Sequence, residues 1–190
     1  MPDGPGGNTR GPVVLLFVAR ALAASVEVFL HDTKTFGERY LGTQTAAAVL
    51  ILFLFPAVGG QEDPMPLYCF LVAYLFMCVG VRVGVVARRA RGELGEHSYY
   101  SGRPYLMRSL GRMRESTVKG AVEPVLMWLT GILCQPFSAL LGTYLMIAGV
   151  GLLVSVQVTL AAERRRLLDM HDAYMEQRRI AEEWRRMRRD

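Results

Sequence analysis

The amino-acid sequence predicts an all-α, multi-pass membrane protein with a charged cytoplasmic face. The apolar stretch at positions 121–162 is too long for one bilayer crossing, which takes about 20 residues, and is right for two. A second stretch, 41–87, has the same character. The chain is 52% hydrophobic, yet its 22 basic and 17 acidic residues lie almost entirely outside these stretches. We therefore predict four membrane-spanning helices, arranged as two hairpins.

The N-terminal thirty residues divide into two parts. Positions 1–12 are rich in Gly, Pro and Asp and show no apolar periodicity, so we predict a disordered terminus. Positions 13–30 are apolar apart from Arg20, Ser25 and Glu27. Because Arg20 and Glu27 are seven residues apart, they share one face of a helix.

Three interpretations of positions 13–30 remain open. The helix can lie in the membrane interface with its charged stripe among the headgroups, and we favour this amphipathic form. It can instead span the membrane with its charges sheltered inside a bundle. A cleaved signal peptide is the third interpretation, because Arg10 precedes the apolar run and Ala21-Leu22-Ala23 has the small-x-small form of a cleavage site.

The first predicted hairpin, 41–87, indicates the orientation of the chain. Its spans, 41–60 and 67–87, are joined by an acidic turn at 61–66 that has no basic residue. The loop that follows, 88–119, carries eight basic residues. Basic loops stay on the cytoplasmic side, so we predict a plasma (cytoplasmic) membrane protein with this loop inside.

The second predicted hairpin, 121–162, consists of a short span, 121–136, and a longer span that begins at Ser138. The connection between them holds no basic residue, as expected of the outer side. The charged segment 163–190 follows this hairpin, and we predict that it forms a cytoplasmic C-terminal helix.

The cytoplasmic loop 88–119 contains a cluster of tyrosines around a Gly-Arg-Pro turn. The cluster is either a turn whose aromatic rings sit at headgroup level or a docking surface for a protein partner. Beyond it, apolar residues recur at helical spacing between arginines as far as Lys119, which predicts a basic amphipathic helix on anionic inner-leaflet lipids. The candidate partner-binding residues of the loop are Tyr99, Tyr100, Arg103 and Tyr105.

The C-terminal segment shows a seven-residue repeat. Leu160, Leu167, Tyr174 and Ala181 repeat every seven residues, and Met170 and Trp184 occupy the intermediate row, which Glu163 and Gln177 interrupt. This pattern is typical of a helix with an imperfect coiled-coil seam. Self-association, partner binding and a merely solvated helix all remain open. The candidate partner-binding residues here are Leu167, Tyr174 and Trp184.

Two features of the predicted spans concern helix association. Small residues four positions apart allow helices to approach closely. They occur as the pair Gly80 and Gly84 and as the pair Gly151 and Ser155. Arg82 and Glu123 fall at matching depths near the cytoplasmic ends of their spans. They form a candidate intramembrane ion pair, although Arg82 can also extend to the interface while Glu123 stays there.

We predict no catalytic residue, no metal site and no cofactor. Cys69, Cys78 and Cys134 show no CxxC spacing, although Cys69 and Cys134 can pair if the outer side is oxidising. His97 beside Ser98 has no acidic partner at a spacing typical of a catalytic site, which argues against an enzyme acting on lipid. The C-terminal segment mixes acids with its arginines, so nucleic acid is not an expected partner.

The leading functional hypothesis is an integral membrane anchor or scaffold subunit. It would assemble with itself or with a partner protein on the cytoplasmic face, where the polar residues of the chain are concentrated. The alternative is a small transporter or channel subunit whose pathway lies between protomers. Both hypotheses include the lipid bilayer as a partner, and neither requires a catalytic site.

Overall fold

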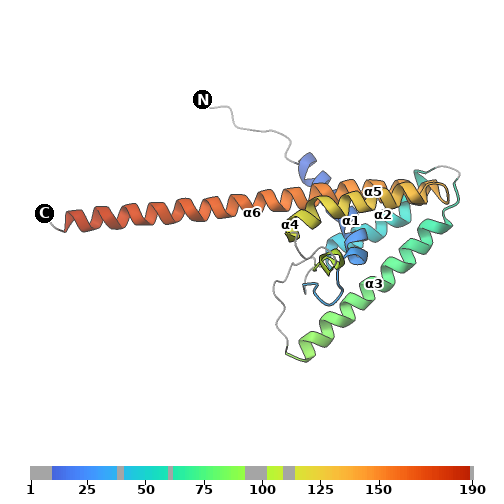
Figure 1. Cartoon of the computed structure of the whole chain (residues 1–190), viewed down its shortest axis with the longest axis horizontal. Helices are drawn as coiled ribbons and strands as arrows, with labels where there is room; N and C mark the ends of the chain where they lie inside the picture. Colours follow the sequence, from blue (N-terminus) through green and yellow to red (C-terminus); the bar gives the residue numbers. More distant parts are fainter. Residues whose placement is uncertain (1–9, 38–40, 60–61, 93–101, 109–113, 189–190) are drawn as a thin grey trace. The chain divides into compact units, whose positions relative to one another are not determined.

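The computed structural model describes residues 10–37, 41–59, 62–92, 102–108 and 114–188, and these are all-α, as predicted. Figure 1 shows the five principal helices along the chain. One isolated β-bridge joins His31 to Pro104. The chain forms two compact units, which divide after Ser155. The principal helices are α1 (Arg10–Leu30), α2 (Thr43–Leu54), α3 (Met65–Ala90), α5 (Glu123–Cys134) and α6 (Ala139–Met187).

Four short elements complete the described structure. The 3-10 turn η1 (Phe55–Ala57) follows α2, and a second, η2 (Tyr105–Arg108), lies in the long loop. The short helix α4 (Glu115–Thr117) leads into the π-helical turn η3 (Val118–Val122), which continues directly into α5.

Among the described residues, four helices are long and apolar enough to cross a membrane; three coincide with predicted spans, and the fourth is the N-terminal helix in place of the predicted span 41–60. They are Val13–Leu30, Met65–Ala90, Glu115–Cys134 and Ala139–Met187. The predicted span 41–60 instead forms the 12-residue α2 and the turn η1. Pro56 lies in this turn and has no N–H for a helical hydrogen bond, which explains why the regular α-helix stops there.

The second half of helix α1 lies in the interior of the first unit, whereas we favoured an interfacial position for the helix; in its first half Val13, Val14 and Leu15 are exposed. Every residue from Ala21 to Val28 is buried. The helix packs on α2 and α3, and its Ala19 and Leu22 lie against Gly151 of α6. Because its buried part is rich in alanine, neighbouring helices can approach it from several sides. A segment that is buried on every side belongs inside a bundle, and this holds for Ala21 to Val28.

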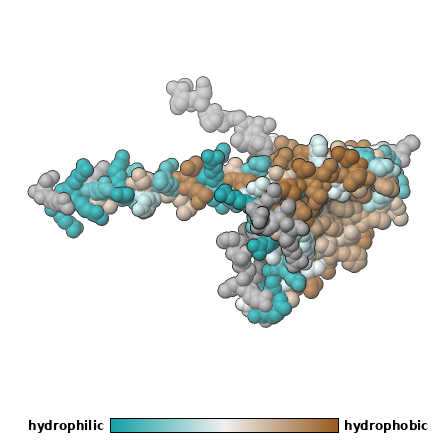
Figure 2. Space-filling view, in the orientation of Figure 1, coloured by the Kyte–Doolittle hydropathy of each residue, from teal (hydrophilic) through white to brown (hydrophobic). Residues whose placement is uncertain are grey.

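The other helices of this unit expose large apolar side chains. Phe76 of α3 is 73% exposed and Leu133 of α5 is 71% exposed. Figure 2 shows apolar residues over much of the visible surface of this unit. Exposed apolar surface on this scale is unfavourable in water and marks a protein or membrane contact. Together with the helix lengths, it fits a multi-pass membrane protein.

The second unit, 156–190, contains the C-terminal part of α6. From Ala161 to Met187 every residue whose side chain is described is exposed, including Leu167, Tyr174 and Trp184. Figure 2 shows that most of this segment is hydrophilic, with apolar residues interspersed. Two ion pairs within the helix join Arg178 to Glu182 and Arg179 to Glu176.

Replacing Gly151 with leucine will test the contact between α1 and α6. A Cβ at position 151 would lie 2.8 Å from the Leu22 Cβ and 2.9 Å from the Ala19 carbonyl oxygen. Overpacking of this kind costs about 1–3 kcal/mol. We expect Gly151→Leu to lower the free energy of unfolding by that amount, measured by denaturant titration in detergent.

Gly80→Leu is the matched control. No described atom lies within 4 Å of a Cβ at position 80. Leucine also has a higher helix propensity than glycine, so this variant should be as stable as the original chain or slightly more stable. Equal losses of stability in the two variants would contradict the proposed contact.

Candidate functional site

A buried carboxylate and imidazole pair joins the end of α1 to the start of α5. The Nε2 atom of His31 lies 3.0 Å from each carboxylate oxygen of Glu123. His31 is 1% exposed and Glu123 is fully buried. Ionisable groups in such surroundings are costly unless they are paired and hydrogen-bonded, so the two side chains stabilise one another. The pair connects residues 92 positions apart in the chain.

A second carboxylate extends the pair into a cluster. Glu27 lies one helical turn before His31 on α1 and is also buried. It interacts electrostatically with His31, Glu123, Lys119 and Arg20. We call Glu27, His31 and Glu123 the buried cluster. It holds two carboxylates around one imidazole, with cationic side chains at its edge.

The π-helical turn η3 determines where Glu123 points. In this turn the backbone N–H of Glu123 donates to the carbonyl of Val118, five residues earlier. Pro124 follows and has no N–H to offer to Gly120, so a regular helical pattern cannot continue through this point. The extra residue rotates the face of the helix that follows. Such π-bulges occur frequently at functional sites.

Tyr144 of α6 satisfies a second polar group of α1. Its hydroxyl donates to Ser25 Oγ at 2.7 Å, and the Ser25 hydroxyl donates to the Leu22 carbonyl at 2.7 Å. Both side chains are fully buried. This chain of hydrogen bonds and the buried cluster therefore connect α1 to both helices of the second hairpin.

The Gly-Arg-Pro turn lies over His31. The Asp32 N–H donates to the Arg103 carbonyl at 2.9 Å, and the Arg103 N–H donates to the Thr35 hydroxyl at 2.7 Å. Gly102 has a φ of 87°, and a Cβ there would lie 3.2 Å from both His31 and Phe36. A larger residue would be strained and would crowd the imidazole, so glycine suits this position.

In this cluster an imidazole lies directly against a carboxylate, with the His31 Nε2 atom 3.0 Å from each carboxylate oxygen of Glu123. A group of three His, Cys, Asp or Glu side chains with the arrangement of a metal site does not occur among the described residues. Intramembrane ionisable residues mark ion pathways and proton relays by default. The cluster is therefore a candidate functional site within the first unit.

The structure does not bring together the two residues of the predicted ion pair. Glu123 bonds with His31, whereas the Arg82 guanidinium donates to the Leu41 carbonyl. Arg82 is exposed and Glu123 is fully buried. Sequence reasoning identified Glu123 but missed Glu27 and His31 as its neighbours. The available signal was their four-residue spacing, which places them on one face of a helix.

The four small residues of the predicted packing faces differ in their surroundings. Gly151 lies against Ala19 and Leu22 of α1. Ser155 is half-buried. Gly80 is exposed, and a Cβ on Gly84 would have the Thr33 carbonyl as its nearest contact at 3.9 Å. Of the three glycines, Gly151 is the one that lies in close contact with a neighbouring helix.

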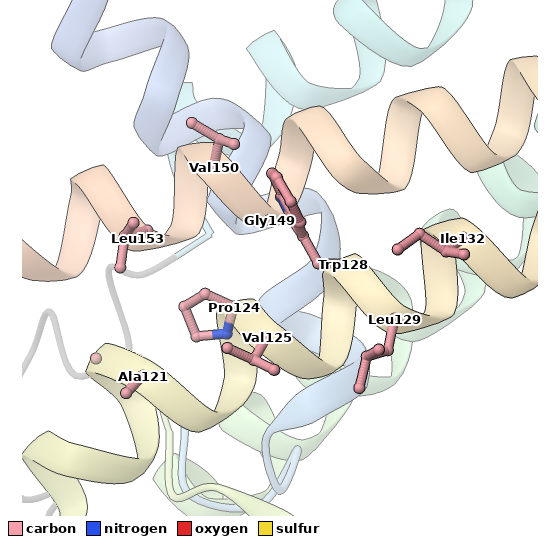
Figure 3. Close-up of a pocket in the computed structure, with 10 residues that line it drawn as sticks. Ala121, Pro124, Val125, Trp128, Leu129, Ile132, Gly149, Val150 and Leu153 are labelled. Carbon is pink, nitrogen blue, oxygen red and sulfur yellow. The ribbon is translucent and has the colours of Figure 1, made fainter.

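A shallow apolar groove lies between α5 and α6 (Figure 3). Its volume is about 380 Å³. Trp128, Leu129 and Ile132 line it from α5, and Gly149 and Leu153 line it from α6. With almost no polar atom in its walls, the groove can hold an acyl chain or a neighbouring side chain but offers no group for catalysis.

The predicted loop surface is described only in part. Tyr99 and Tyr100 lie outside the described residues, as do His97 and Ser98. Arg103 is exposed, and Tyr105 is 41% exposed at the start of η2. Both are available for contact with a partner. Cys69, Cys78 and Cys134 are free thiols in this structure.

The C-terminal part of α6 presents a broader apolar face than the predicted seam. At 3.6 residues per turn, three further residues fall on the same side as the seam and widen it. They are Ala173, Ile180 and Met187, all exposed. We call the whole set the tail face, made up of Leu167, Met170, Ala173, Tyr174, Ile180, Ala181, Trp184 and Met187.

Comparison of the chain with protein-family models, with curated proteins and with solved structures finds no match. The two candidate sites therefore rest on their own geometry. They are the buried cluster in the first unit and the tail face in the second.

Removing one partner of the buried pair should destabilise the first unit strongly. His31→Ala leaves the Glu123 carboxylate buried without its partner, at a cost of about 3–5 kcal/mol. The double variant His31→Leu/Glu123→Leu removes both groups. Its loss in free energy of unfolding should be smaller than the sum of the losses of His31→Leu alone and Glu123→Leu alone. Denaturant unfolding in detergent measures each free energy, and the double-mutant cycle isolates the interaction.

Glu62→Gln is the control, because Glu62 is an exposed carboxylate outside the cluster. Its effect should stay within about 0.5 kcal/mol. Strictly additive losses for His31 and Glu123 would show that the pair does not contribute as a unit.

Proposed function

We propose that the protein is an integral membrane scaffold subunit that assembles with itself or with a partner protein through its C-terminal helix. The observation that carries this proposal is the tail face. Trp184 is 65% exposed, Leu167 66% and Tyr174 61%, and these aromatic and aliphatic side chains lie on one side of a helix that no other described segment covers. Clustered exposed aromatic and apolar residues are typical of protein interfaces.

The proposed orientation places the tail in the cytoplasm of a cell whose plasma membrane holds the spans. The loop 88–119 carries eight basic residues, and the turn 61–66 carries none. Basic loops remain inside. The bond between His31 and Glu123 holds the end of α1 beside the start of α5, which supports assigning both to the same membrane side. If α1 begins outside and ends inside, the shorter apolar segment Thr43–Ala57 would return the chain to the outside before α3 begins.

The mass of the protein in nanodiscs tests the scaffold proposal. We expect the full chain to form a defined oligomer or a stable complex with a partner, and the variant lacking residues 163–190 to be monomeric and to bind no partner. Native mass spectrometry and pull-down with the full chain as bait measure both properties. A chain that is monomeric with and without the tail, and that retains no specific partner, would refute the proposal.

A second candidate function is favoured by the buried cluster. Two carboxylates and an imidazole in the apolar first unit suit a subunit that binds and transfers protons during transport. The pathway would involve Glu27, His31 and Glu123. The cluster lies near the ends of α1 and α5, so it would form one end of such a pathway and not its whole length.

Proton flux in reconstituted vesicles tests this candidate. We expect Glu123→Gln to abolish a pH-gradient-driven flux, because the amide cannot accept a proton from His31. Glu62→Gln, which neutralises an exposed carboxylate, should leave the flux unchanged. Vesicles that remain tight to protons with the original chain would remove the transport candidate.

A further inference from the structure

The flanks of the tail face carry opposite charges. On one side of the face stand Arg178 and Arg185, and on the other stand Asp169 and Glu176. All four residues are exposed. At 3.6 residues per turn, the two pairs lie along opposite edges of the tail face, so the width of that face separates them. The basic pair and the acidic pair are called the basic flank and the acidic flank.

This arrangement distinguishes between parallel and antiparallel pairing of two copies. In a parallel pair related by rotation about an axis along the helices, the right flank of one helix meets the left flank of the other. The basic flank of each copy then faces the acidic flank of its neighbour. In an antiparallel pair each flank meets its own counterpart, so arginine faces arginine and carboxylate faces carboxylate.

The heights of the charged residues also agree with parallel pairing. Glu176 and Arg178 are only two residues apart, about 3 Å along the helix axis. In register, Glu176 of one copy therefore lies at nearly the same height as Arg178 of the next. Each side chain already makes an ion pair within its own helix, Arg178 with Glu182 and Glu176 with Arg179. Those contacts are exposed, so the same groups can also bridge between helices.

Membrane topology also favours parallel pairing. In every copy the tail follows the apolar first part of α6, which is long enough to span the bilayer. Copies inserted in the same way therefore present their tails on the same side of the membrane. Confinement to one surface raises the effective concentration of the tails for one another.

We propose that the tail face binds the tail face of a second copy of this chain, in parallel and in register. The inference rests on the proposed scaffold function and names the partner as the chain itself. The apolar residues of the two faces supply the contact area, while the opposite flanks select the parallel orientation. Trp184 would lie beside Trp184 of the second copy, and Met170 beside Met170.

Disulfide cross-linking of the full chain in nanodiscs tests this arrangement. The three native cysteines are first replaced by alanine. Met170→Cys then places a single thiol on the tail face, near the N-terminal end of that face along the helix. Asp172→Cys places a thiol on the opposite side of the helix and is the matched control. We expect rapid formation of a cross-linked dimer with Met170→Cys and little with Asp172→Cys.

A mixture of two variants tests the opposite orientation. Antiparallel pairing about the centre of the tail face would join Met170→Cys to Trp184→Cys and would leave Met170→Cys alone uncross-linked. That result would overturn the parallel arrangement.

Reversing the charge of the basic flank tests whether the flanks select the orientation. The substitutions Arg178→Glu and Arg185→Glu should abolish the Met170→Cys dimer. Adding a second chain with Asp169→Arg and Glu176→Arg should restore a mixed dimer.

The outcomes separate this inference from the scaffold proposal. If Met170→Cys gives no dimer but removal of 163–190 still releases a partner or dissociates an oligomer, the inference fails and the scaffold proposal stands. If the chain is monomeric and binds no partner with or without the tail, both fail. Cross-linking that survives reversal of the basic flank would refute the role of charge in selecting the orientation.

Discussion

Helix α1 brings Ser25, Glu27 and His31 into the buried interior of the first unit, and the remaining helices must satisfy these groups. Glu123 of α5 pairs with His31, and Tyr144 of α6 bonds to Ser25. In apolar surroundings an unpaired polar side chain costs several kcal/mol, so these two contacts restrict how the second hairpin can be placed. The π-helical turn before Glu123 and the small residue Gly151 both serve that placement.

The same arrangement gives the two candidate sites different chemistry. The first unit pairs its buried ionisable groups inside and exposes apolar side chains outside, which suits a bilayer. Its buried cluster pairs an imidazole with a carboxylate, and its groove between α5 and α6 is apolar. The second unit reverses this organisation, because its charges are exposed and many of its apolar residues form one face of a single helix.

A scaffold and a proton-binding subunit are compatible within one molecule. Parallel association of the tails would hold several bundles side by side, and each bundle would contribute its own buried cluster. Gly80 of α3 is exposed in the single chain and is available for contacts between bundles. The tail would then govern the number of copies, whereas the cluster would govern any movement of protons.

The sequence by itself determined the all-α class, the apolar stretches and the repeat in the tail, because hydropathy and helical period are local properties of consecutive residues. It placed Glu123 near a helix end and offered Arg82 as its candidate partner, since matching depth along two spans does not specify which helices are neighbours. It also treated α1 as interfacial, because Arg20 and Glu27 share a face. Only the tertiary structure decided that α1 is central and that His31 meets Glu123. His31 and Glu123 are 92 positions apart in the sequence and meet only because of how the helices pack. The pattern of neighbouring residues does not specify that packing.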